Sequence, residues 1–175
     1  MMKFNTSEPI RGQLLIADID PIATPRPRFR RIGKGVQTYY KKEYKDYLQE
    51  IRNEFQKEYA RKEGDPIIKK EDHFNKMYIS FIMPRPKYHY GTGKNSGKIK
   101  EKYKDVQHNT KPDLDNLSKA VLDALTGLLY EDDTQITDLG AIKRYTNLDM
   151  LPEKPGIYIG WIYKESANGE SGNTP

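Results

Sequence analysis

The chain has 175 residues, a net charge of +5 and no cysteine, so it can form one hydrophobic core but no disulfide or cysteine-based zinc site. Charged residues make up 31% of the chain and hydrophobic residues 35%, which is polar for a globular domain and implies loops or tails. No stretch approaches membrane-spanning length and the N-terminus has no apolar leader segment. We therefore expect a cytoplasmic protein with no membrane partner.

Hydrophobic periodicity predicts four strands and two helices. Tyr44, Tyr47, Leu48, Ile51 and Phe55 recur at helical spacing and predict one buried helix face. In chain order we expect a strand at 14–20, an extended loop at 22–35, a helix at 41–62, a strand at 77–83, a helix at 113–129, and strands at 136–145 and 157–163.

This β-α-β-α-β-β order predicts an α+β fold, with two main helices packed on one face of a small mixed sheet. We expect residues 1–165 to form a single domain. Residues 87–110 are basic, contain few apolar groups and are expected to be a mobile loop. Residues 166–175 have the composition of a disordered tail.

The charges are segregated along the chain. Residues 23–45 contain eight bases and one acid, and residues 85–111 contain eight bases and two acids. Residues 112–138 reverse this pattern, with seven acids and one base. Carboxylates repel phosphates, so an acidic block inside a basic chain favours a metal-dependent nuclease, in which carboxylates hold cations that contact the phosphate.

Within the acidic block, Asp113 and Asp115 stand at the expected start of a helix, where the helix dipole stabilises negative charge. Lys119 follows Asp115 by four residues and shares its helix face. More ordinary interpretations exist for each feature: Asp113 as a helix cap, Asp115 and Lys119 as a surface ion pair, and residues 131–133 as a solvated turn.

The run Asp-Leu-Asp-Asn-Leu-x-Lys at 113–119, Asp123-Ala-Leu, an aromatic residue and Asp132-Asp133-x-Gln-Ile resembles the signature of the RusA family of phage and prophage Holliday junction resolvases. Pro25-Arg-Pro-Arg-Phe after the first strand is similar to a loop of that family. The resemblance covers roughly residues 12–163. The long segment 87–110 and the C-terminal tail depart from the family pattern.

The resemblance implies a homodimeric endonuclease that nicks four-way DNA junctions symmetrically with Mg²⁺ or Mn²⁺, in DNA recombination and repair. It also implies that Asp113, Asp115 and Asp133 are catalytic metal ligands and that Lys119 is essential. Asp132 ranks below Asp133. Alternatives are a metal-dependent nuclease acting on other branched or single-stranded nucleic acid, and a non-catalytic branched-DNA-binding protein.

A geometric problem accompanies this assignment. A helix over 115–128 is about 20 Å long at 1.5 Å per residue, which places Asp133 at the end far from Asp113. Either the helix is broken near Gly127 or the acids meet across a dimer interface, and we hypothesise the second. We expect the closely spaced bases of the first basic segment to contact DNA phosphates. These bases are Arg26, Arg28, Arg30, Arg31 and Lys34.

Overall fold

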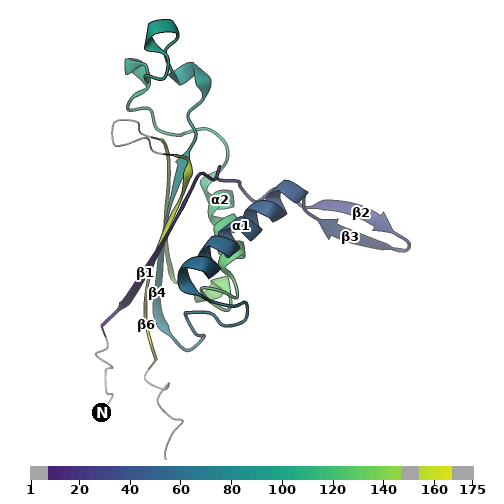
Figure 1. Cartoon of the computed structure of the whole chain (residues 1–175). Helices are drawn as coiled ribbons and strands as arrows, with labels where there is room; N and C mark the ends of the chain where they lie inside the picture. Colours follow the sequence, from purple (N-terminus) through teal and green to yellow (C-terminus); the bar gives the residue numbers. More distant parts are fainter. Residues whose placement is uncertain (1–7, 147–153, 167–175) are drawn as a thin grey trace, which may run out of the picture.

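The computed structural model describes residues 8–146 and 154–166 of the chain (Figure 1). None of the described helices is long and apolar enough to cross a membrane. The elements are β1 (Ile10–Ala17), β2 (Arg28–Ile32), β3 (Gly35–Tyr39), α1 (Lys42–Tyr59), β4 (His73–Met83), α2 (Leu114–Leu125), β5 (Asp138–Tyr145) and β6 (Gly156–Lys164), with the short 3-10 helices η1 (Lys87–His89), η2 (Gly93–Asn95), η3 (Glu101–Tyr103) and η4 (Asp133–Gln135).

Four strands form one mixed sheet in the order β1-β6-β4-β5. β4 and β5 are parallel, whereas β1 and β4 both pair antiparallel to β6. Helices α1 and α2 pack on one face of this sheet, as Figure 1 shows. The predicted α+β class with two helices on one face of a mixed sheet is therefore confirmed. The expected tail falls on residues 166–175, nearly all of which lie outside the described residues.

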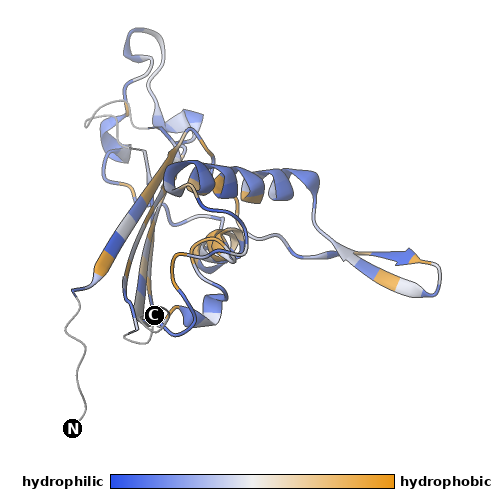
Figure 2. Cartoon of the chain, turned by 60° about the horizontal axis from the view of Figure 1, so that its bottom comes forward, coloured by the Kyte–Doolittle hydropathy of each residue, from blue (hydrophilic) through white to orange (hydrophobic). Residues whose placement is uncertain are grey.

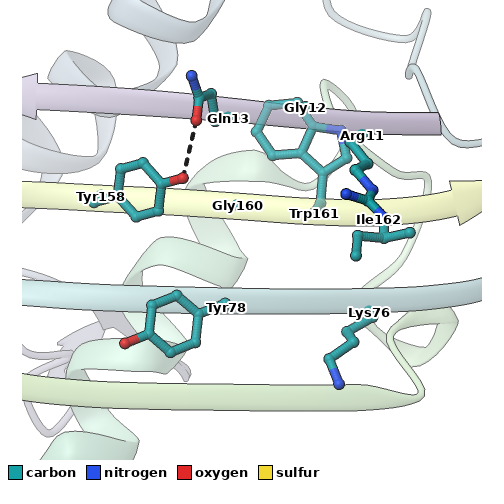
Figure 3. A pocket seen from close by; sticks show the side chains of 9 residues that line it. All are labelled: Arg11, Gly12, Gln13, Lys76, Tyr78, Tyr158, Gly160, Trp161 and Ile162. Carbon is teal, nitrogen blue, oxygen red and sulfur yellow. Dashed lines mark hydrogen bonds between the residues drawn. The ribbon is translucent and has the colours of Figure 1, made fainter. Parts of the chain in front are cut away.

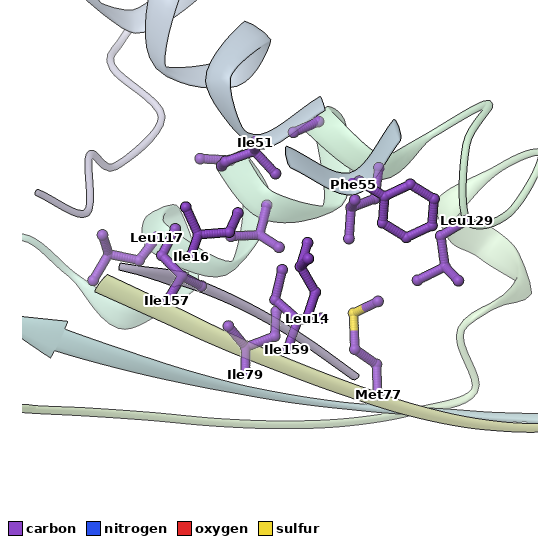
Figure 4. Packing of buried hydrophobic residues seen from close by; sticks show 14 of the residues in the cluster. Leu14, Ile16, Ile51, Phe55, Met77, Ile79, Leu117, Leu129, Ile157 and Ile159 are labelled. Atoms are coloured by element: carbon purple, nitrogen blue, oxygen red, sulfur yellow. The ribbon is translucent and has the colours of Figure 1, made fainter. Parts of the chain in front are cut away.

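The core lies between the sheet and the two helices, where apolar side chains of β1, β4, β5, β6, α1 and α2 converge (Figure 4). The helical stripe predicted for α1 is buried at Tyr44, Tyr47, Ile51 and Phe55. Each such side chain stabilises the fold by about 1.5–3 kcal/mol when fully buried. Figure 2 shows the resulting contrast, with orange strands and α2 facing inward and a mostly blue α1 facing solvent.

The expectation of an extended loop at 22–35 is wrong over its second half. β2 and β3 form a two-stranded antiparallel ribbon that projects from the body, with Ile32 opposite Gly35 (Figure 1). Gly33 has φ +57° at the first of the two turn residues, a conformation that a type II′ hairpin turn requires. The turn glycine and the cross-strand pairing outweigh the arginine-rich composition that indicated a loop.

The segment 87–110, for which we predicted a mobile loop, contains short regular elements. It contains η1, η2 and η3, and isolated bridges join Tyr90 to Ile99 and Gly91 to Ser96. His89 and His108 are buried. The segment folds around its own aromatic residues, which a count of aliphatic residues does not reveal.

α2 ends at Leu125, earlier than the predicted end at 129. Gly127 has φ +79°, and its amide donates to the Tyr130 carbonyl over 2.7 Å, so the chain reverses direction here. The Tyr130 hydroxyl then donates to the Leu122 carbonyl over 2.8 Å, which fixes the returning chain against the helix. The break near Gly127, the alternative that we did not favour, is therefore present.

Candidate active site

The exposed face of α2 carries three charged residues at four-residue spacing, Asp115, Lys119 and Asp123. This spacing places side chains in a row along one side of a helix. The opposite side of α2 is buried in the core through residues such as Leu117 and Val121. The amphipathic pattern that folds α2 onto the sheet thus fixes these charges on the outer surface.

Asp113 occupies the N-cap position of α2, but its carboxylate makes no capping hydrogen bond. Its backbone carbonyl instead accepts from the Leu117 amide over 3.1 Å. The preceding residues are anchored by Lys143, whose ammonium donates to the carbonyls of Thr110 and Pro112, both over 2.6 Å. The position of Asp113 is therefore fixed while its carboxylate oxygens stay available.

The ordinary ion-pair interpretation of Asp115 and Lys119 does not fit the structure. Within the described ranges no salt bridge joins these two side chains. In the same ranges the Asp115 carboxylate accepts one long hydrogen bond, of 3.4 Å, from the side-chain amide of Asn116. Both side chains are exposed. Each keeps the capacity to bind a ligand in solution.

The acidic turn after α2 divides its carboxylates between two uses. The Asp132 carboxylate accepts from the backbone amide and hydroxyl of Thr134, and the Gln135 side chain accepts from the Asp132 amide, forming a capping box on η4. Gln135 also donates to the Lys69 carbonyl over 3.0 Å. The exposed Asp133 carboxylate takes no part in these bonds, so the box presents it to solvent.

The returning chain brings Asp133 close enough to Asp123 for the two charges to interact. Burial raises the pKa of Asp123, the charge of Lys119 lowers it, and the charge of Asp133 raises it again. Tyr44, hydrogen-bonded to Thr24 over 2.9 Å, lies beside the same carboxyl. We did not include Asp123 in the site from the sequence, although its spacing from Asp115 and Lys119 was the available signal.

The donor chemistry of Asp113, Asp115 and Asp133 fits a hard divalent cation, since Mg²⁺ and Mn²⁺ prefer carboxylate oxygens. Among residues 8–146 and 154–166, however, no three acidic or histidine side chains are grouped so that they could hold a metal ion. The structure thus places Asp133 beside Asp123 without gathering the three candidate ligands at one point of one chain.

A basic ribbon starts beside the first turn of α2. The Thr24 amide donates to the Asn116 carbonyl over 2.9 Å, and the chain continues from there into the ribbon of β2 and β3. Arg30 donates to Gln37 across the ribbon over 2.8 Å, which holds its guanidinium on one ribbon face. All five bases predicted to contact DNA are exposed here, and they are Arg26, Arg28, Arg30, Arg31 and Lys34.

A shallow hollow of about 260 Å³ lies on the sheet away from these acids (Figure 3). Tyr158 donates to Gln13 over 3.0 Å at its edge. No carboxylate lines the hollow, which excludes it as the metal-binding part of the site. Its lining residues are Arg11, Gly12, Gln13, Lys76, Tyr78, Tyr158, Gly160, Trp161 and Ile162.

The chain is similar to a known protein family and to a curated protein. The family model described as endodeoxyribonuclease RusA matches residues 18–159, most of the chain. A curated protein of Bacillus subtilis (strain 168), described as uncharacterized protein YqaN, is 42% identical over 72 residues. That second match covers 40% of this chain and 48% of the relative, so the chain spans about half the length of the curated relative it matches.

Proposed function

The chain belongs to the RusA family of endodeoxyribonucleases, and from this premise we propose that it resolves four-way DNA junctions by paired, symmetric nicks that require Mg²⁺ or Mn²⁺. The observation that carries the proposal is the row of charges on α2, with Asp113 before it and Asp133 beside it. The exposed bases of the ribbon support a nucleic-acid substrate.

The roles divide by chemistry. Asp113, Asp115 and Asp133 are the residues that would hold the cation, because their carboxylates are exposed and make no strong bond within the described part of the chain. When bound, the cation lowers the pKa of a coordinated water and offsets charge on the phosphate. Lys119, exposed between two carboxylates, stabilises negative charge that develops on the scissile phosphate or the leaving oxygen.

We propose that the complete site is shared between two subunits of a homodimer. Among its described residues a single chain groups no three carboxylates, and a second copy of the chain would supply the remaining ligand. In a two-fold dimer, Asp113 and Asp115 of one subunit would meet Asp133 of the other. A four-way junction is itself two-fold symmetric, so two such centres suit two symmetric cuts.

The decisive experiment is cleavage of a synthetic four-way junction by the wild-type protein, with Mg²⁺ or with EDTA. We expect paired nicks in opposite strands that disappear in EDTA. The Asp115→Asn variant should bind the junction without cutting it, since it loses a ligand but keeps the ribbon. A linear duplex of the same sequence is the matched substrate control and should stay intact.

Other outcomes discriminate among the alternatives. Equal cleavage of the junction, flaps and single strands would indicate a nuclease of broader specificity. Tight junction binding with no cleavage in Mg²⁺ or in Mn²⁺ would overturn the proposed activity and indicate a DNA-binding protein.

A further inference from the structure

The segment between β4 and α2 forms a separate lobe, which we call the arm and define as residues 85–110. It projects from the end of the sheet, as Figure 1 shows in teal at the top of the view. No residue of the arm belongs to the hydrophobic core of the domain. The arm therefore contributes little to the main fold, and its regular conformation requires another explanation.

Arg85 fixes the base of the arm. Its guanidinium donates to the carbonyls of Thr146 and Tyr103, both over 2.7 Å, and to the Lys104 carbonyl over 3.2 Å. The same guanidinium lies over the ring of Tyr145, 5.3 Å from its centroid. Arg85 thus ties the two ends of the arm to each other and to the end of β5.

Aromatic rings form the interior of the arm. His89 stacks on Tyr103 with 4.2 Å between ring centroids, and Tyr88 meets both rings edge-on. His89 and His108 also contact Tyr145 of β5. These contacts give the arm a defined shape, so the lysines that it carries have defined positions as well.

The arm carries a large positive charge, and much of it is free to bind an anion. Lys87, Lys94 and Lys98 are exposed and form no salt bridge with any residue that the structure describes. Lys102 lies over the Tyr103 ring at 4.9 Å, with its ammonium still exposed. Nearby acids are few, since residues 85–110 contain seven bases against two acids.

The arm and the ribbon are both anchored near the start of α2. The arm ends three residues before Asp113, and Lys143 holds its last carbonyl, that of Thr110. The ribbon departs from Thr24, which is bonded to the first turn of α2. In Figures 1 and 2 the two projections extend away from the body in different directions, with the start of α2 between them.

We propose that the arm is a second phosphate-binding element, which holds the DNA backbone at a position separate from the ribbon. Lys94 lies in η2 at the outer end of the arm, and Lys98 follows it closely in the chain. These two lysines make most of the contacts with the DNA phosphates. The inference rests on the proposed function in taking DNA as the ligand. It assigns a DNA-binding role to a segment that has no residue in the hydrophobic core.

The test is the salt dependence of DNA binding by the double variant Lys94→Gln/Lys98→Gln. Each lost phosphate contact lowers the slope of log affinity against log salt by about 0.9, so we expect a loss of about 1.8. The matched control is Lys57→Gln/Lys62→Gln, which removes two exposed charges outside the arm, the ribbon and the acidic face of α2. This control should keep the wild-type slope.

Phosphate ethylation interference then locates the contact. The arm variant should lose interference at phosphates that an Arg28→Gln/Arg30→Gln ribbon variant retains. The proposal would be overturned if the arm variant lost interference at the same phosphates as the ribbon variant. It would also be overturned if the arm variant had the same salt-dependence slope as the Lys57→Gln/Lys62→Gln control.

The measurements use both a four-way junction and a linear duplex, which separates the two proposals. If the wild type cuts no junction but the arm variant still loses slope on duplex, the proposed function fails and the arm inference stands. If the wild type cuts junctions and the arm variant binds like the control, the arm inference fails alone. Absence of all DNA binding by the wild type would overturn both.

Discussion

Asp132 and Asp133 are neighbours with different surroundings. The Asp132 carboxylate is used by the amide and hydroxyl of Thr134, and these bonds lower its pKa. Asp133 makes no such bond and acts on Asp123 through its charge. Adjacent acids therefore differ in their hydrogen bonds, and the ranking of Asp133 above Asp132 stays a prediction.

We predict opposite outcomes for two matched substitutions at this turn. Asp133→Asn should lower the cleavage rate by about 10²–10³-fold or more, because it removes a ligand charge. Asp132→Asn should cleave near the wild-type rate, because asparagine caps a helix as well as aspartate does. Single-turnover cleavage of a junction measures both, and equal losses in the two variants would contradict the division of roles.

Lys119 is predicted to act in chemistry and to add little to stability. Lys119→Gln should slow single-turnover cleavage by about 10²-fold or more, since it removes a cation beside the scissile phosphate. Its free energy of unfolding should stay within about 0.5 kcal/mol of the wild type, because Lys119 is exposed. Urea unfolding provides the second measurement, and a large destabilisation with normal cleavage would indicate a structural residue.

At the scale of elements, the reversal after α2 depends on Gly127. Its φ of +79° is unfavourable for any residue with a Cβ, although no atom would clash with that Cβ. Gly127→Ala should therefore destabilise the protein by about 1–2 kcal/mol through backbone strain alone. Urea unfolding measures this loss. Gly160→Ala, where a Cβ meets only Tyr158 at 3.7 Å, is the control and should be neutral or slightly stabilising.

The arm should lose its packing in mild acid. Burial lowers the pKa of His89 and of His108 below the ordinary value of about 6.5, and the charges of Arg85, Lys100 and Lys143 lower it further. The folded arm therefore binds fewer protons than the opened arm, and its stability falls as the pH drops through 6.5 toward the folded-state pKa. At higher pH both histidines are neutral and this penalty is absent.

Near-ultraviolet circular dichroism of Tyr88 and Tyr103, which pack against His89, would measure this effect between pH 7.5 and pH 5.5. We expect the signal to decline in the wild type on acidification. A His89→Gln/His108→Gln variant, which lacks both titrating rings, should give the same spectrum at the two values. A wild-type spectrum that does not change would show that the arm tolerates protonated histidines.

At the scale of the whole molecule, the shared site predicts complementation between inactive subunits. A mixed dimer of Asp115→Asn and Asp133→Asn subunits would contain one intact centre, whereas each homodimer contains none. Random mixing should restore about a quarter of the centres and produce single nicks rather than paired cuts. Nicking of a labelled junction measures the recovery, and no activity above that of the separate variants would place each site within one subunit.

Hydrophobic periodicity was sufficient to predict the sheet strands, both helices and the packing of the helices on one face. Helical spacing marked the buried side of α1, and β-branched runs marked strands such as 157–163. These patterns are readable because burial selects residues by their position along one element. Periodicity failed for the ribbon, whose strands are exposed on both faces, and for the arm, whose interior consists of aromatic rings and one arginine.

The sequence by itself determined which residues are candidates for chemistry, because the resemblance to the RusA signature singles out the carboxylates at 113, 115 and 133 and the lysine at 119. Only the tertiary structure decided which of the acids are free. It placed Asp132 in a capping box, left Asp113 without a capping bond and turned the chain at Gly127 so that Asp133 lies beside Asp123. Hydrogen bonds and chain reversals join residues distant in sequence, so their outcome depends on packing that no local pattern encodes.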